Sequence, residues 1–181
     1  MSLQNLTMSK RDLKKYIQEL NTVQLQEQLI ELYDKFKEVK VYYDFAFNPN
    51  EQKLLGAAKA KIANEYFPIK GKRAKMRRSI AQKFIKHFIT LGVDVTMIAD
   101  LMFFTIETSQ RFSTKRYIKY DSFFKSIFTA FEQAVAFSIE NGIINEFLGR
   151  IIEIKEEANR QKWINQEEFN ALLEKIDDNF L

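Results

Sequence analysis

The chain contains no cysteine, one histidine (His87), two prolines and five glycines among its 181 residues. Without cysteine it forms no disulfide and no thiolate metal site, and it has no thiol nucleophile. One histidine is too few for a di-iron carboxylate bundle, which needs two Glu-x-x-His pairs. The absence of cysteine fits a reducing compartment, so we expect a cytoplasmic protein.

The chain also lacks a long apolar run. Its most apolar stretch, from Val95 to Ile106, is interrupted by Asp100 and is too short to span a bilayer. The N-terminus has no apolar core of the kind that signal peptides carry. We therefore expect no membrane partner. A helix-capping pattern begins at Ser9, so residues 1–8 are predicted to be a disordered or non-native leader and 9–181 a single helical domain.

Apolar residues recur at helical spacing through nearly the whole chain, and no segment alternates as a strand would. The fold class predicted is all-α, with about eight helices in a single compact bundle or a stacked helical-hairpin array. The expected helices begin at Ser9, at Thr22 (running to Phe36 or on to Tyr43), at Asn48-Pro49 (to Tyr66), at Arg73 (to Gly92), at Asp94, at Asp121 (to Gly142), near Phe147, and at Asn165 with Glu168 as its capping partner.

Charge is distributed unevenly along the chain. Residues 66–93 include no acidic side chain and eight cations. The wider segment 66–131 carries 13 basic and 4 acidic side chains, a net charge of +9, while residues 132–181 carry 5 and 11, a net charge of −6. The middle of the chain is therefore basic and its end acidic, which points toward a polyanionic partner or toward self-association.

The basic segment 70–86 is the candidate polyanion-binding site. On a helical projection Lys75, Arg78 and Lys86 lie along one side of a helix, and the other side is apolar, with Met76, Ile80 and Phe84. Fixed cations of this kind release counterions from a phosphate backbone. A solvated face, neutralised by the acidic end, is the competing interpretation. The candidate residues are Lys70, Lys72, Arg73, Lys75, Arg78 and Lys86, and Arg111, Lys115, Arg116 and Lys119 would extend the site.

The sequence gives little support for a catalytic histidine, a calcium site or a catalytic pair of carboxylates. His87 falls on the apolar side of its helix, which predicts a packing role. The segment from Glu157 to Glu168 looks like an EF-hand exit, but Lys162 stands where such a loop needs glycine, so no metal site is expected. Asp100 and Glu107 share one helix side and would suggest an enzyme only within a convergent acidic pocket. No catalytic residue and no cofactor is predicted.

Several segments together resemble an uncharacterised family of small all-helical bacterial proteins, classed as a domain of unknown function. The resemblance covers most of the chain after Met8 and implies a single cytoplasmic helical domain, with no activity attached. The segments that carry it are the opening from Ser9 through Tyr16, the segment from Leu32 to Lys40, the Phe47-Asn48-Pro49 turn and the run from Arg77 to His87.

From these patterns we expect a non-catalytic helical protein-interaction or scaffold domain. Its partner would be another protein, or a second copy of the chain held by complementary charge. The alternative is a nucleic-acid-binding protein that contacts the phosphate backbone through residues 70–86. Aromatic side chains for base stacking are scarce there, because Phe84 is the one aromatic between residues 70 and 86.

Overall fold

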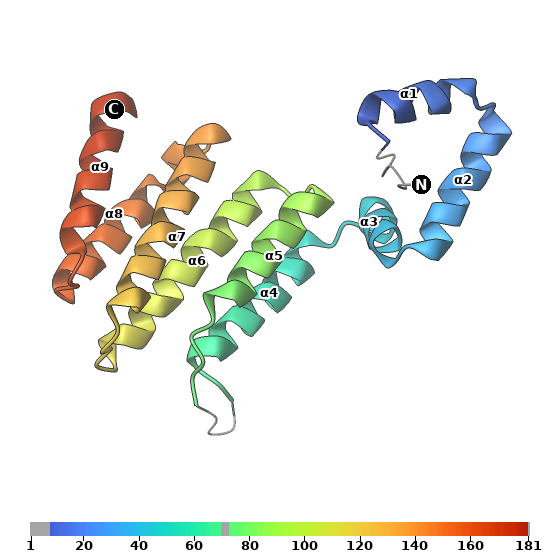
Figure 1. The fold of residues 1–181 in the computed structure, drawn as a ribbon. Coiled ribbons are helices and arrows are strands. Elements are labelled where there is room, and N and C mark those ends of the chain that lie inside the picture. The colour runs from blue at the N-terminus through green and yellow to red at the C-terminus, as the bar shows by residue number, and fades with distance from the viewer. Residues whose placement is uncertain (1–7, 70–72, 181) are drawn as a thin grey trace, which may run out of the picture. The chain divides into compact units, whose positions relative to one another are not determined.

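The structure, a computed structural model, describes residues 8–69 and 73–180, with side chains as far as residue 176. Within these residues the chain forms nine helices and no strand, which confirms the predicted all-α class (Figure 1). Contacts divide the chain into two compact units, residues 1–49 and 50–181. The single domain over 9–181 stays a prediction, and the proposed leader lies almost wholly outside the described residues.

Unit 1 contains three helices, α1 (Lys10–Glu19), α2 (Thr22–Lys35) and α3 (Lys37–Phe47). Ser9 and Asp12 form the expected capping box at the start of α1. The expected continuation of the second helix to Tyr43 is wrong, because Phe36 adopts an extended conformation that separates α2 from α3. No glycine or proline marks this break, so the sequence pattern misses it and counts one helix too few.

Unit 2 contains six helices that lie next to one another in an antiparallel array (Figure 1). They are α4 (Glu51–Tyr66), α5 (Arg78–Leu91), α6 (Val95–Thr114), α7 (Asp121–Glu140), α8 (Ile144–Arg160) and α9 (Gln166–Phe180). The start of α4 lies two residues later than predicted, since Asn50 and not Asn48 caps it by accepting a hydrogen bond from the Lys53 backbone. Gly92 and Gly142 end α5 and α7 in the left-handed conformation that glycine favours.

The core of unit 2 is built around α6, which packs against α4, α5, α7 and α8. Its Leu101, Phe103 and Ile106 are completely buried, as expected for a helix that is apolar nearly all round. Gln110 of α6 is also buried and donates a hydrogen bond of 2.7 Å to the Ile154 carbonyl on α8. In the part of the chain that the structure describes, each helix is too short or too polar to cross a membrane.

Alternation of helix direction brings three connections to the same end of unit 2. The α4–α5, α6–α7 and α8–α9 connections lie there, while the turns at Gly92 and Gly142 lie at the opposite end (Figure 1). We call residues 73–77, 115–120 and 161–163 the loop end. Segments far apart in the sequence thus share one surface, and this surface holds the strongest candidate site.

Candidate functional site

The first segment of the loop end, residues 73–77, is fixed by Glu65 near the end of α4. The backbone N–H groups of Lys75 and Met76 both donate to the Glu65 carbonyl, at 2.9 and 3.0 Å. The Arg77 guanidinium donates two hydrogen bonds of 2.8 Å to the Glu65 carboxylate, whose side chain is 9% exposed. Because these contacts hold the segment in a non-helical conformation, α5 begins at Arg78 and the predicted start at Arg73 is wrong.

Glu65→Gln should lower the free energy of unfolding by about 1 kcal/mol at neutral pH, because charge-assisted bonds to the half-exposed Arg77 are lost. The hydrogen bond from Arg77 holds the pKa of Glu65 below its ordinary value. A carboxyl with a lowered pKa stabilises the fold above its unfolded pKa of about 4.3, and this contribution disappears as the pH falls through the folded pKa. Urea unfolding should therefore separate wild type from variant at neutral pH and not well below pH 4. An unchanged gap would mean that the carboxylate charge is not what matters.

The second segment, residues 115–120, is positioned by an aromatic cluster beneath it. Tyr66 and Phe67 at the end of α4 each contact Phe112 of α6 edge-on, with ring centroids 5.8 Å apart. The guanidinium carbon of Arg116 lies 5.2 Å from the Phe112 ring centroid. A cation over an aromatic face is attracted by the ring quadrupole, so Arg116 is both anchored and exposed.

Two neighbouring pockets open at the loop end. The first basic pocket, about 370 Å³, lies between the segment 73–76 and the segment 116–120, and its cations are Arg73, Arg116 and Lys119. The second basic pocket, about 460 Å³, lies between the segment 113–118 and the segment 161–163, and its cations are Lys115, Arg116 and Lys162. Arg116, Tyr117 and Ile118 line both pockets and form the ridge between them.

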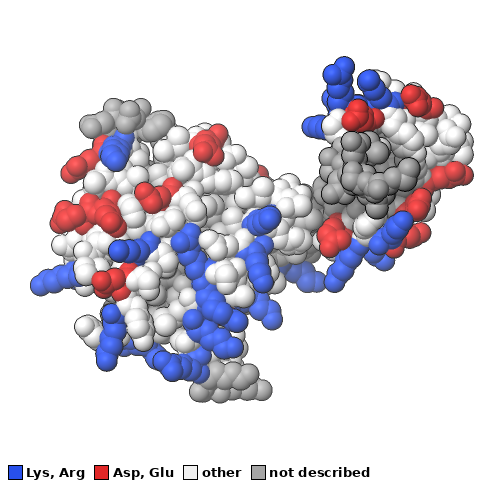
Figure 2. All heavy atoms as spheres, in the orientation of Figure 1, with Lys and Arg blue, Asp and Glu red and all other residues white. Residues whose placement is uncertain are grey.

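Five cations from three connections therefore surround one surface. Among the described residues, neither lining includes an Asp or Glu side chain. The acid beside the second basic pocket is Glu157, which accepts hydrogen bonds from the Thr114 and Gln161 side chains of that lining. Figure 2 shows Lys and Arg gathered at this end of unit 2 on the face drawn. Unpaired like charges raise the local positive potential, and a bound anion relieves their mutual repulsion.

The predicted site residues divide into three groups. Lys70 and Lys72 lie outside the described residues. Arg73 and Lys75 are exposed at the loop end, although Lys75 precedes α5 and is not part of a helical stripe. Lys86 is exposed on α5, about 12 Å along the helix axis from Arg78. The structure thus places Arg73 in one pocket with Arg116 and Lys119, whereas neither Lys75 nor Lys86 lines it.

Arg78 has a different environment, because its guanidinium faces α7. It donates to the Ser126 carbonyl at 2.6 Å and to the Gln133 side chain at 2.8 Å. Burial lowers the pKa of Arg78, and both acceptors of its guanidinium lie on α7. These contacts join two helices, so replacing Arg78 would disturb packing as well as charge.

His87 does not have the packing role that its position on the apolar side of the helix predicted. Its side chain is exposed, and its recorded ring contact is with the adjacent Phe88, whose own side chain is buried. The projection placed both residues on one face, but neighbours in a helix point about 100° apart, and the face of α5 that packs against α6 is narrower than the apolar pattern.

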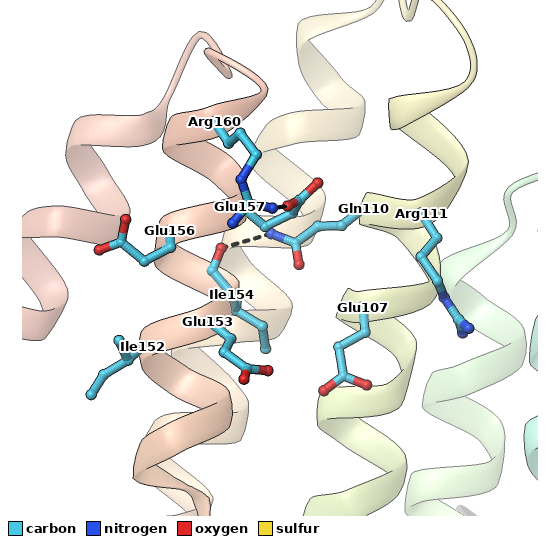
Figure 3. Close-up of a pocket in the computed structure, with 9 residues that line it drawn as sticks. All are labelled: Glu107, Gln110, Arg111, Ile152, Glu153, Ile154, Glu156, Glu157 and Arg160. Atoms are coloured by element: carbon cyan, nitrogen blue, oxygen red, sulfur yellow. Dashed lines mark hydrogen bonds and ion pairs between the residues drawn. The ribbon is translucent and has the colours of Figure 1, made fainter.

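A third pocket of unit 2, about 420 Å³, is acidic. It lies between α6 and α8, where Gln110 reaches across to the Ile154 carbonyl (Figure 3). Its charged residues are Glu107, Arg111, Glu153, Glu156, Glu157 and Arg160. Glu107 pairs with Arg150 at 2.7 Å, and Glu157 pairs with Arg160. Asp100 pairs with Lys59 and Arg150, so the two carboxylates considered for catalysis instead hold α4, α6 and α8 together.

The EF-hand interpretation fails on local structure, because residues 157–160 belong to α8 and form no loop. Lys162 does adopt a left-handed conformation, with φ of 52°, but it ends a helix: the Trp163 N–H donates to the Ala158 carbonyl. In the described part of the chain, no three His, Cys, Asp or Glu side chains are grouped as metal ligands would be.

A family of unknown function (DUF6155) matches residues 8–177, which confirms the resemblance to an uncharacterised all-helical family. The match includes every described helix of both units except the last three residues of α9. No curated protein and no solved structure matches the chain. The family description gives no activity, so the geometry of the loop end is the main guide to function.

Proposed function

The chain belongs to this family of unknown function, and we propose that it is a non-catalytic protein that binds nucleic acid, contacting the phosphate backbone with the loop end of unit 2. One observation carries the proposal. Arg73, Lys115, Arg116, Lys119 and Lys162 come from three separate connections and line two adjoining pockets without an acidic partner among the described residues.

The support is stronger than a charge run in the sequence, because the other described arginines of unit 2 all donate hydrogen bonds to protein groups. Arg77, Arg78 and Arg150 donate hydrogen bonds to protein acceptors and serve the fold. The side chains of the five cations that line the two basic pockets form no hydrogen bond and no ion pair with another described side chain, although Arg116 lies over the Phe112 ring. Cations left free in this way are available to phosphate oxygens, and each contact releases condensed counterions.

The proposed site differs in position from the predicted one. The sequence predicts binding along a helix within residues 70–86, whereas the loop end combines residues 73–77 with the segments 115–120 and 161–163. Lys115, Arg116 and Lys119 were named as an extension of the site, and Lys162 was considered for a calcium loop instead. A cytoplasmic location remains part of the proposal, since a chain without cysteine suits a reducing compartment.

Salt dependence tests the proposal. If all five cations contact phosphates of a single strand, the logarithm of the binding constant should fall with the logarithm of salt concentration at a slope of about −3.5. Affinity for a labelled oligonucleotide, measured by fluorescence anisotropy, should then drop about 100-fold between about 50 and 200 mM salt. Absence of binding at the lower salt concentration would reject the proposal.

Self-association is the second candidate, favoured by the separation of charge within the chain. Residues 66–131 carry a net charge of +9 and residues 132–181 one of −6, so a basic surface of one copy complements an acidic surface of another. Charge-driven association should be strong at low salt and weaken at high salt. Light scattering should then give a mass that rises with protein concentration at low salt. A constant monomer mass under those conditions contradicts this candidate.

A further inference from the structure

Two tyrosines of the loop end are exposed to an unusual degree. Tyr117 is 87% exposed and Tyr120 66% exposed, while the rings beneath them, Tyr66 and Phe112, are buried. Tyr117 lines both basic pockets and Tyr120 lines the first. Neither ring has a recorded contact with another aromatic ring of the described residues. Their faces are therefore open to a ligand.

Cations and aromatic rings alternate along this segment. The sequence from residue 115 reads Lys-Arg-Tyr-Ile-Lys-Tyr, so each tyrosine follows one cation or two. Proteins that bind single strands combine a cationic groove for the backbone with aromatic rings on which bases stack. The segment 70–86 has a single ring, Phe84, on the apolar side of its helix, so the sequence pattern of that segment gives no sign of base stacking.

We propose that the loop end binds single-stranded nucleic acid in preference to duplex, with bases stacked on Tyr117 and Tyr120 and phosphates on the surrounding cations. This inference rests on the proposed nucleic-acid binding and adds the class of strand. Tyr117 lines both pockets and Tyr120 lines the first, so a strand that passes from one pocket to the other meets both rings.

Duplex nucleic acid should bind this surface less tightly than a single strand does. Its bases are stacked on one another and its outer surface is phosphate and sugar, so the tyrosine faces have no base to contact unless the helix opens. A single strand has unstacked bases that enter a concave site at little cost. Duplex binding would therefore use the cations alone, and single-strand binding would use cations and rings.

Arg116 lies where phosphate contacts and base contacts would meet. Its guanidinium is held over the Phe112 ring and lines both pockets, so its position on the ridge is fixed before a ligand arrives. A pre-positioned cation loses less side-chain freedom on binding than a lysine in solvent does. Binding should depend on Arg116 more than on Lys115 or Lys119.

The test compares two probes on the full chain. The probes are a fluorescein-labelled oligothymidine of about 16 nucleotides and a duplex of the same length, both at low salt. The proteins are wild type, Tyr117→Ala/Tyr120→Ala and the conservative control Tyr117→Phe/Tyr120→Phe, which keeps the rings. Because both tyrosines are exposed, the variants should fold, and circular dichroism checks this.

We expect the oligothymidine to bind at least 10-fold more tightly than the duplex. The alanine variant should lose at least 10-fold for the single strand and less than 2-fold for the duplex, and the phenylalanine variant should bind like wild type. Equal affinity for both probes with no effect of the alanine variant overturns the single-strand inference while leaving phosphate binding intact. Failure of both probes to bind wild type overturns the proposed function itself.

Discussion

Replacing Arg73, Arg116 and Lys119 with glutamine should reduce affinity for single-stranded nucleic acid about 100-fold at low salt. These three cations line the first basic pocket, and each exposed phosphate contact is worth about 1 kcal/mol, so their combined loss approaches two orders of magnitude. The slope of affinity against salt should become shallower by about two units, because three fewer counterions are released. Anisotropy titrations at several salt concentrations measure both quantities.

A charge-matched control separates a local site from a general attraction to a basic protein. Lys83 and Lys86 are exposed on α5, outside both basic pockets, and Lys125 is exposed on α7. Replacing these three lysines with glutamine removes the same charge, and we expect less than a 3-fold loss of affinity. Equal losses in the two triple variants would show that net charge, and not the loop end, attracts the nucleic acid.

Removing Arg150 should have the largest effect on stability. Its guanidinium donates to Glu107 at 2.7 Å and to Asp100 at 2.8 Å, and it lies 5.5 Å from the ring centroid of Phe103. Although burial disfavours its charge, the hydrogen bonds that Arg150 donates to Glu107 and Asp100 raise the pKa of Arg150 above its ordinary value. Without Arg150 the two carboxylates face each other with Lys59 as the remaining cation.

We expect Arg150→Ala to lower the free energy of unfolding by about 2–4 kcal/mol, somewhat less than for a fully buried pair, because the side chains remain about a quarter exposed. Urea unfolding at neutral pH measures the loss. Adding Asp100→Asn and Glu107→Gln should restore at least half of it, since neutral amides need no cation. If they restore nothing, the loss comes from the packing of Arg150 on the aromatic rings and not from the unpaired carboxylates.

Most helix boundaries were predictable because the signals for them are local. The capping box of Ser9 and Asp12, the Asp94 cap and the glycines at 92 and 142 act on backbone groups within a few residues, so the sequence displays them directly. The central position of α6 was also predictable, since a helix with few polar residues on any face must be surrounded.

The failures have a different origin, because they depend on contacts between distant residues. The helix predicted from Arg73 lacks its first turn, because the backbone N–H groups of Lys75 and Met76 donate to the Glu65 carbonyl. Met76 takes a left-handed conformation there, with φ of 51°. The sequence pattern predicts a surface cation at Arg78, whereas in the structure its guanidinium donates to the Ser126 carbonyl on α7. No sequence pattern reveals which helix will supply such partners.

The loop end was missed for the same reason, although part of its signal was present. Lys115, Arg116 and Lys119 belong to the predicted extension of the site, but Tyr117 and Tyr120 do not, because the densest run of cations in the sequence lies within residues 70–86. Joining the segments 73–76, 115–120 and 161–163 requires knowing that alternating helix direction brings three connections to one end. The alternation of cations and tyrosines in residues 115–120 is the one feature of the sequence that indicates this surface.

The most direct test of the account is an NMR titration of the isotope-labelled chain with a short oligothymidine. Because shift changes report position, the account predicts that the perturbed amides belong to residues 73–77, 113–120 and 161–163, with those of Tyr117 and Tyr120 among the largest. Perturbations confined to the acidic pocket between α6 and α8 or to unit 1, or a spectrum unchanged at saturating oligonucleotide, would contradict it.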